Sequence, residues 1–189
     1  RFKHEFINSV IYNWSSDGYI MADTDNADSP ANVIGNYFIA GPSSSLNGYM
    51  TRSTPRFMMY PEDNWLDDNR DGQLNGRELK AADGDYKTAT IMDTPWDYPG
   101  VNQVLSAQEA VQHIIDNAGP SIARDEVDKL LISQLKSFGT EGKIITTESD
   151  NGIEENVGAV VGGTYPKDTD NDGMPDEWED ANGTDKNVK

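Results

Sequence analysis

Two short apolar segments near the start of the chain resemble each other. They are Asn8-Ser9-Val10-Ile11-Tyr12 and Gly35-Asn36-Tyr37-Phe38-Ile39, and they lie 27 residues apart. Each places a small polar pair before β-branched or aromatic residues, which favour strands. Repeats of roughly 20 to 45 residues are typical of stacked coils, in which each coil buries its apolar face against its neighbours. The spacing therefore predicts stacked β-coils, with two unrelated strands of a β-sandwich as the alternative.

The composition limits the classes of function that this chain can have. Its 189 residues include 15 Lys and Arg against 33 Asp and Glu, a formal net charge of −18 at pH 7. This charge opposes binding to nucleic acid and to anionic membranes. The chain has no cysteine, so a metal would be held by oxygen or histidine, and oxygen ligands favour Ca²⁺ or Mg²⁺. No stretch approaches the roughly 20 apolar residues of a membrane-spanning helix.

The order of apolar runs and turn residues divides the chain into three parts. Residues 1–105 predict β-coils and long loops, with one short helix near residues 76–82. Residues 106–166 predict a helical segment that caps the coils, and residues 167–189 predict a terminal loop and helix. The predicted fold is an all-β structure with added helices.

Residues in the second part carry clear helix signals. Ser106 and Glu109 form a capping box ahead of an amphipathic run that stops at Gly119-Pro120. A second helix is predicted over residues 124–138, where leucine and other apolar residues recur at helical spacing. The following GKIITT segment, residues 142–147, predicts a strand. The helix faces are interpreted as packing surfaces and not as sites.

Residues 67–78 have the pattern of a calcium-binding loop. Oxygen-bearing side chains recur at alternate positions around a sharp bend at Gly72, and Leu74 occupies the apolar position beyond it. Calcium takes about six to eight oxygen ligands in flexible geometry, and Gln73 would add its backbone carbonyl. A solvated acidic turn is the alternative interpretation. The predicted ligands are Asp67, Asn69, Asp71, Gln73, Asn75 and Glu78.

Residues 168–179 repeat this pattern with more negative charge. Four aspartates and one glutamate would repel one another unless a cation neutralised them. Neither loop follows a clear incoming helix, and Pro175 stands where a paired EF-hand forms its small strand. Both loops therefore predict isolated sites at which Ca²⁺, as cofactor, stabilises the fold locally. The predicted ligands in the second loop are Asp168, Asp170, Asp172, Met174, Asp176 and Glu179.

Other motifs indicate no catalytic chemistry. His4 and His113 belong to no metal-binding or nucleophile-activating pattern. Asn13-Trp14-Ser15 and Asn182-Gly183-Thr184 are N-glycosylation triplets, which matter only in a eukaryotic secretory host. The residues by themselves therefore favour calcium binding over catalysis.

Several segments, taken in order, resemble a known family. They are KHEFINSVIYNW, ANVIGNYFIAGPSSS, DNRDGQLNG, LSAQEAVQHIIDNAGPSIARDEVD with GKIITT after it, and DTDNDGMPDEWEDANGT. This order resembles the C-terminal half of bacterial pectate lyases of the first polysaccharide lyase family, over nearly the whole chain. The last segment is also similar to the calcium loops of thrombospondin type 3 repeats and dockerins. The resemblance implies a right-handed parallel β-helix, of which this chain forms the C-terminal coils.

The resemblance also implies an activity. In that family calcium bridges acidic side chains and the carboxylate of polygalacturonate, and an arginine removes the neighbouring proton to start β-elimination. The family's acidic calcium cluster and its Arg-x-Pro-x-x-Arg motif precede the VIYNW strand, where this chain has only Arg1-Phe2-Lys3. The resemblance places Arg1 and Lys3 at the end of that motif, as substrate-binding residues. We therefore expect the catalytic arginine to lie upstream of Arg1 and this chain alone to be inactive.

Three functional interpretations follow. The first is part of a bacterial pectate lyase that is secreted, periplasmic or on the cell surface, with polygalacturonate and a preceding part of the same protein as partners. The second is a non-catalytic, calcium-stabilised module of an extracellular surface or adhesion protein. The third is another carbohydrate-active β-helix protein. An Arg-x-Pro motif and a cluster of acidic residues in the sequence before Arg1 would favour the first interpretation, and their absence would favour the second.

Overall fold

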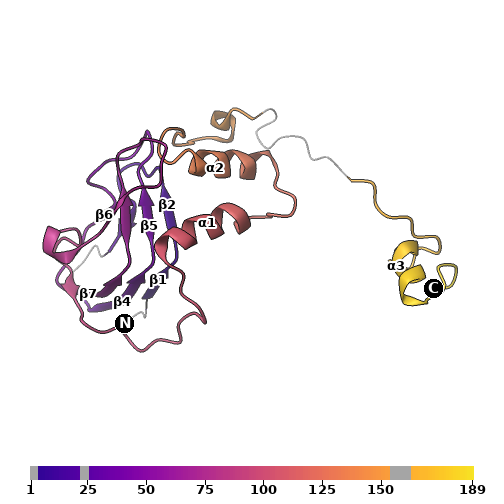
Figure 1. The fold of residues 1–189 in the computed structure, drawn as a ribbon, viewed down its shortest axis with the longest axis horizontal. Coiled ribbons are helices and arrows are strands. Elements are labelled where there is room, and N and C mark those ends of the chain that lie inside the picture. The colour runs from indigo at the N-terminus through magenta and orange to yellow at the C-terminus, as the bar shows by residue number, and fades with distance from the viewer. Residues whose placement is uncertain (1–3, 22–25, 154–162) are drawn as a thin grey trace. The chain divides into compact units, whose positions relative to one another are not determined.

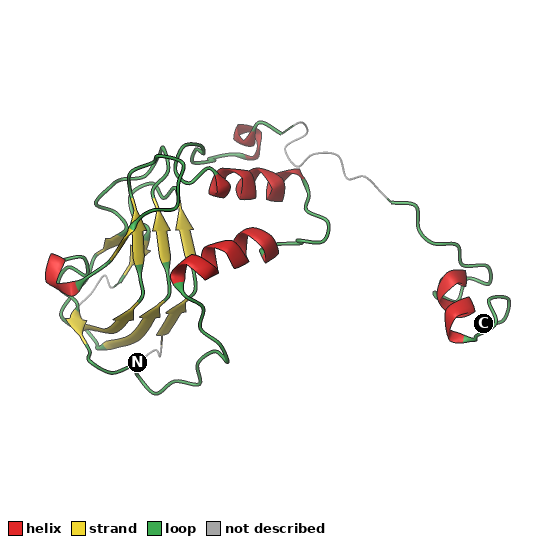
Figure 2. Ribbon diagram, in the orientation of Figure 1, coloured by secondary structure: helices red, strands yellow, loops and turns green. Residues whose placement is uncertain are grey.

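The computed structural model describes residues 4–21, 26–153 and 163–189. The chain divides into two compact units, Arg1–Gly158 and Ala159–Lys189. The first unit contains stacked strands with two helices beside them, and the second contains a loop and one short helix (Figures 1 and 2). No helix in the described residues is long and apolar enough to cross a membrane.

The strands of the first unit form three sheets whose neighbouring strands come from successive coils. One sheet has the order β1-β4-β7-β10 and contains His4–Ile7, Ser29–Ile34, Phe57–Glu62 and Thr90–Ile91. A second has the order β2-β5-β8-β9 and contains Val10–Tyr12, Tyr37–Ile39, Trp65–Asp67 and Arg77–Glu78. A third pairs β3 (Tyr19–Ile20) with β6 (Met50–Thr51). Because the chain visits the sheets in turn, it winds through about three turns of a parallel β-helix, which confirms the predicted fold.

The register between coils matches the repeat found in the sequence. Val10 of β2 pairs with Tyr37 of β5, which lies 27 residues further along the chain. Tyr37 pairs in turn with Trp65 of β8, after a further 28 residues. Both pairings are parallel, so the two similar segments are equivalent strands of successive coils. This arrangement decides against the β-sandwich alternative.

The bend between the first two sheets is built alike in each coil. Asn8, Gly35 and Asp63 have positive φ angles of 47°, 64° and 50°, a region that glycine and short polar residues tolerate best. Just beyond the bend, Asn36 Nδ2 donates to Asn64 Oδ1 of the next coil at 2.9 Å. Both asparagines are fully buried, so this bond satisfies polar groups that have no access to water. The small polar residues before each strand of the second sheet therefore form the bend at which the coil turns from the first sheet to the second.

The interior of the β-helix is filled by side chains from all three sheets. Alternate residues of a strand point inward, which is why Ala31 and Val33 of β4 are both buried. Aromatic rings add to this core, and Phe6 stacks on Tyr19 with ring centroids 4.4 Å apart. The buried cluster comprises Trp14, Met21, Ala31, Val33, Phe38, Ala40, Tyr49, Met50, Phe57, Met59, Leu66, Leu79 and Tyr86.

Two helices lie beside the sheet of β2 and β5, as Figure 1 shows. They are α1 (Ala107–Asn117) and α2 (Glu126–Lys136). The Ser106 side chain accepts from the Glu109 backbone and the Glu109 carboxylate accepts from the Ser106 backbone, so the predicted capping box is confirmed. The helices bury apolar side chains against the outer face of the coils. This second cluster comprises Tyr37, Ile39, Ala107, Val111, Ile115 and Leu135.

The predicted short helix near residues 76–82 is wrong. Arg77–Glu78 instead form β9, which pairs antiparallel with β8, and a 3₁₀ helix follows at Ala81–Asp83. The cause is Gly76, where a Cβ atom would lie 2.4 Å from the Leu66 carbonyl oxygen. Only glycine lets the chain return this closely along β8.

The predicted strand over residues 142–147 is also wrong. Its residues lie outside every sheet of the described chain, because no strand edge pairs with them. A short 3₁₀ helix, Glu148–Asn151, follows this segment. An apolar β-branched run forms a strand only where a neighbouring strand accepts its hydrogen bonds.

The second unit contains one short helix, α3, at Asp176–Asn182. It begins directly after Pro175 and ends at Gly183, whose φ of 76° is left-handed, and it lies within the terminal loop and helix predicted over residues 167–189. Within the described residues of this unit, the buried side chains belong to Asp176 and Glu179. A unit whose buried side chains are acidic cannot be held together by apolar packing.

Candidate metal centre

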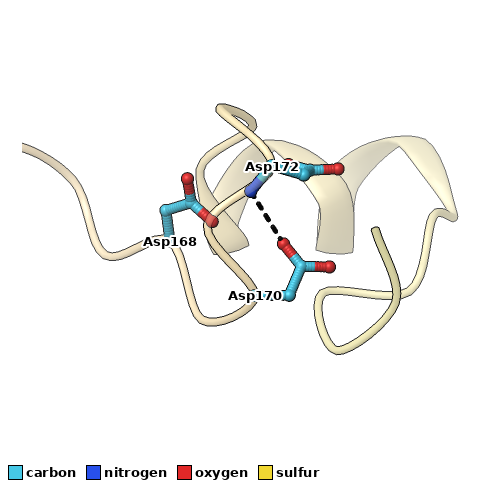
Figure 3. Close-up of side chains that lie close together, drawn as sticks. All are labelled: Asp168, Asp170 and Asp172. Carbon is cyan, nitrogen blue, oxygen red and sulfur yellow. Dashed lines mark hydrogen bonds between the residues drawn. The ribbon is translucent and has the colours of Figure 1, made fainter.

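Three carboxylates converge at the start of the terminal loop. The oxygen atoms that Asp168, Asp170 and Asp172 offer as ligands all lie within 4.8 Å of one another (Figure 3). Short local bonds orient them, since Asp172 N donates to Asp170 Oδ1 at 3.2 Å and Met174 N donates to Asp172 Oδ1 at 2.8 Å. Turns of this kind are a regular property of aspartate in loops. The sequence pattern therefore does bring its first three acidic residues together.

Asp168 is held by the bend of the loop itself. Its Oδ1 accepts from Asn171 N at 2.8 Å, and its Oδ2 accepts from Gly173 N at 2.9 Å. Gly173 has a φ of 98° and Asn171 a φ of 60°. These left-handed residues make the sharp turn that the pattern predicts at this glycine.

Glu179 is a fully buried carboxylate that accepts no hydrogen bond from the described residues. Its exposed fraction is 0%, and within that part of the chain neither carboxylate oxygen has a partner. The buried Oδ2 of Asp170 lacks a partner as well. Burial, followed by the charges of Asp170 and Asp172, raises the pKa of Glu179. An isolated buried carboxylate is strongly unfavourable, so a divalent cation close to Glu179 would stabilise it. Glu179 is not one of the three residues whose ligand oxygens lie within 4.8 Å of one another, so the structure brings together Asp168, Asp170 and Asp172 but leaves Glu179 outside that group.

Asp176 lies at the base of the same loop, and protein donors occupy its carboxylate. Its Oδ1 accepts from Thr169 N at 2.7 Å, while its Oδ2 accepts from Lys167 Nζ at 2.9 Å and from Thr169 Oγ1 at 2.8 Å. The Lys167 hydrogen bond, with those of Thr169, lowers the pKa of Asp176. The sequence pattern assigns Asp176 and Glu179 the same role, whereas the structure gives them different surroundings.

Loop 67–78 has a different environment. Asp67 ends β8 and is buried, and its Oδ2 accepts from Asn75 N at 3.0 Å. Burial raises the pKa of Asp67, although backbone hydrogen bonds from Asn75 and Asn69 oppose the rise. Both oxygens of Asp71 are engaged, Oδ1 by Gln73 N and Oδ2 by Asn75 Nδ2, each at 2.9 Å. The loop is therefore closed by its own hydrogen bonds.

The last predicted ligand of this loop lies at the surface. Glu78 belongs to β9, opposite Trp65, and its exposed carboxylate lies 3.7 Å from Lys80 Nζ. Gly72 has the expected left-handed φ of 83°. Among the described residues, no buried oxygen of loop 67–78 lacks a partner. Calcium binding in this loop stays a prediction, without the buried free carboxylate that marks loop 168–179.

Arg77, near the end of this loop, forms an ion pair with the buried carboxylate of Asp85, and no sequence pattern predicts this pair. Asp85 is 2% exposed and accepts from Arg77 Nη1 and Nη2, both at 2.8 Å. Tyr49 Oη and the Lys80 backbone complete its hydrogen bonds, at 2.8 and 2.7 Å. Burial alone would raise the pKa of Asp85, but the hydrogen bonds from Arg77, Lys80 and Tyr49 lower it to about 2.

The predicted substrate-binding residues Arg1 and Lys3 lie outside the described residues. The nearest described residue is His4, whose Nε2 lies 2.8 Å from Tyr19 Oη at the exposed end of the first coil. Burial lowers the pKa of His4. The roles of Arg1 and Lys3 therefore stay predictions.

The fold and site together define an acidic parallel β-helix protein with a candidate calcium loop. Over 185 residues the chain is 43% identical to Probable pectate lyase C of Emericella nidulans, 44% to that of Aspergillus fumigatus and 42% to that of Aspergillus terreus. These alignments cover 98% of this chain but only 42–43% of each relative, so the chain spans less than half the length of the curated relatives it matches. No protein-family profile and no solved structure matches the chain.

The chain is thus similar to pectate lyases over nearly its whole length. This finding agrees with the family that the sequence segments indicated. The named relatives are fungal, so the bacterial origin expected from the sequence stays a prediction.

Proposed function

We propose that this chain is part of an extracellular pectate lyase that cleaves polygalacturonate by calcium-assisted β-elimination. The observation that carries the proposal is the identity of about 43% to pectate lyases over 98% of the chain. The parallel β-helix supports it, because stacked coils offer a long surface along which an extended polymer can bind. In β-elimination a base removes the proton next to the uronate carboxylate, and a divalent cation stabilises the charge that develops.

Within such an enzyme this chain would supply coils, the flanking helices and a calcium-binding terminal unit. The matched relatives are more than twice as long as the matched segment, since it covers 42–43% of them. We assign the catalytic arginine and the substrate calcium cluster to the part of the enzyme before Arg1. Arg1 and Lys3 would bind substrate at the boundary with that part.

The proposal also includes Ca²⁺ in loop 168–179. The ligands would be the carboxylates of Asp168, Asp170, Asp172 and Glu179, with the Met174 carbonyl and Asp176 as the remaining predicted ligands. Bound there, the cation would supply positive charge to a buried carboxylate that has no protein donor. We propose loop 67–78 as a second, weaker site, because Ca²⁺ would have to replace the hydrogen bonds that now engage Asp71.

A chimera tests the enzymatic part of the proposal. The 185 matched residues of the Emericella nidulans protein are replaced by this chain, and the product is incubated with polygalacturonate and Ca²⁺. Unsaturated products of β-elimination absorb ultraviolet light, so absorbance reports activity. We expect activity from the chimera, its loss with a chelator, and none from this chain alone.

The alternative function gives a different result in the same experiment. A non-catalytic module would bind calcium and be stabilised by it. Calcium binding in loop 168–179 would explain this behaviour as well as it explains part of an enzyme. A chimera that unfolds cooperatively and gains thermal stability from Ca²⁺, yet cleaves no polygalacturonate, would support that module over the enzyme. Activity of this chain alone would show instead that the assignment of the catalytic arginine to the preceding part is wrong.

A further inference from the structure

Two potential modification sites stand apart from the proposed function. Asn13-Trp14-Ser15 and Asn182-Gly183-Thr184 each have the Asn-x-Ser/Thr pattern that accepts an N-linked glycan in a eukaryotic secretory pathway. The matched relatives are fungal, so the pattern can be tested in a host related to theirs. Such triplets are common by chance, and their surroundings in the fold must decide between them.

Asn13 has no room for a glycan. It is 6% exposed, and its Oδ1 accepts from Ser43 N at 2.8 Å inside the coil. A Cβ atom added at Gly41 would lie 2.5 Å from Asn13 Oδ1, and one added at Gly142 would lie 3.1 Å from Asn13 Nδ2. Backbone therefore packs against both ends of this amide. A sugar on Nδ2 would prevent the neighbouring segments from closing over the first coil.

Asn182 presents the opposite situation. It is the last residue of α3, and Asn182, Gly183 and Thr184 are all exposed. The left-handed Gly183, with a φ of 76°, ends the helix and turns the chain at the triplet. Asn182 Nδ2 donates to the Trp178 carbonyl at 2.8 Å. A glycosylated amide keeps one of its two N–H groups, so the modification is compatible with this bond.

We infer that in a eukaryotic secretory pathway Asn182 accepts an N-linked glycan and folded chains carry none on Asn13, an inference that rests on the extracellular location in the proposed function and applies to such a host. The reaction forms a bond between Asn182 Nδ2 and the anomeric carbon of an oligosaccharide supplied as a lipid pyrophosphate. The lipid pyrophosphate leaves, and the amide nitrogen loses one proton. Transfer to a nascent chain precedes folding, so the fold acts afterwards: a chain with a sugar on Asn13 cannot complete its first coil.

The test uses the full chain, expressed in a fungal host behind a secretion signal. Thr184→Ala and Ser15→Ala each destroy one triplet while leaving both asparagines in place, and both hydroxyl residues are exposed. Protein from the medium and from the cells is treated with an amidase that releases N-linked glycans, and gel mobility and peptide mass are compared. In protein from the medium we expect a mobility shift in the wild-type chain and in Ser15→Ala, no shift in Thr184→Ala, and the mass of a deamidated residue at 182.

A secreted wild-type chain without a shift would overturn the inference, as would a shift in secreted protein that survives Thr184→Ala or disappears in Ser15→Ala. A sugar on Asn13 is expected only in the cell fraction, because a chain that carries it cannot fold, and its mass at residue 13 in secreted protein would contradict the inference. The polygalacturonate assay on the chimera does not depend on the glycan. Failure of the proposed function and failure of this inference are therefore distinguishable.

Discussion

The two compact units each bury a carboxylate, but they neutralise it in different ways. In the β-helix unit, Asp85 accepts two hydrogen bonds from Arg77, one from Tyr49 and one from the backbone. In the terminal unit, Glu179 is buried as completely and accepts no hydrogen bond from the described residues. A buried charge needs a compensating charge wherever it lies. The β-helix supplies that charge through Arg77, and the proposed function assigns the same task in the terminal unit to Ca²⁺ from solution.

The same contrast separates the two acidic loops. Their residue patterns are nearly alike, and both place a left-handed glycine at the bend. In loop 67–78 the carboxylate oxygens of Asp71 accept from groups of the loop itself. In loop 168–179 the oxygens of Glu179 and one of Asp170 have no donor among the described residues. We therefore rank loop 168–179 as the stronger candidate for calcium binding.

Removal of calcium should have the largest effect, and this effect should fall mainly on the terminal unit, because loop 67–78 is proposed as the weaker site. At a thousandfold excess over its dissociation constant, Ca²⁺ that binds only the folded unit stabilises it by about 4 kcal/mol. Adding a chelator to the full chain should therefore speed amide exchange in residues 168–183 by about a thousandfold, measured by mass spectrometry. Peptides from β4, β5 and β7 serve as the internal control and should change by less than about tenfold, since the proposed site in loop 67–78 is the weaker one. Equal exchange in 168–183 with and without calcium would contradict the contrast.

Asp85→Asn should destabilise the β-helix by about 2–3 kcal/mol, measured by denaturant unfolding at pH 7. Breaking a buried ion pair costs about 3–5 kcal/mol, and the half-exposed Arg77 reduces that range. Asp83→Asn, at an exposed neighbour in the 3₁₀ helix, is the control and should have little effect. Calcium should alter neither result, because this carboxylate has its own cation.

The same pair makes a prediction about pH. The folded pKa of Asp85, about 2, lies below its ordinary value of 3.8. Its stabilising contribution is therefore complete above about pH 4 and is lost as the pH falls towards 2. The difference in unfolding free energy between the wild type and Asp85→Asn should shrink over that interval. A difference that stays constant from pH 5 to pH 2 would show that the ion pair is not its source.

Asp71→Ala should have the smallest effect, about 1 kcal/mol, because it removes hydrogen bonds in an exposed loop. If calcium also binds loop 67–78 weakly, it should raise the melting temperature of the β-helix unit in the wild-type chain. Asp71→Ala should lose that increase. Asp68→Ala, an exposed non-ligand position in the same loop, is the matched control. An equal loss of calcium-dependent stabilisation in the two variants would mean that calcium acts through the overall negative charge and does not bind at a site in this loop.

Local and periodic features of this fold were predictable from sequence. The 27-residue spacing predicted stacked coils because each coil repeats the same corner, with Asn8 and Gly35 at equivalent bends. The capping box was predictable because Ser106 and Glu109 interact within a single helical turn. The three aspartates of loop 168–179 converge because alternate residues around a sharp bend face the same point.

Features that depend on contacts between distant segments were not predictable. Gly76 reverses the chain because of its approach to Leu66, and no propensity of residues 76–82 reports that contact. No sequence pattern predicts that Arg77 and Asp85 pair, because the segment between them has neither the helical nor the strand spacing that would place two side chains on one face. The different surroundings of Asp176 and Glu179 depend on Lys167, which precedes the loop, and on Thr169, which is not one of the predicted ligands. Residue types were enough to predict that both loops could bind calcium. Ranking the two loops required the burial of their carboxylates and the hydrogen-bond donors around them, which only the structure gives.

Calorimetric titration of Ca²⁺ into Glu179→Gln, with Glu177→Gln as the control, tests the central claim most directly. Both substitutions remove one negative charge from α3, but Glu179 is buried and Glu177 is exposed. If Ca²⁺ neutralises the buried carboxylate, Glu179→Gln should weaken the tighter binding step by at least about tenfold, or about 1.4 kcal/mol, while Glu177→Gln keeps it. Equal affinities in the two variants, or no calcium binding by the wild-type chain, would contradict the account.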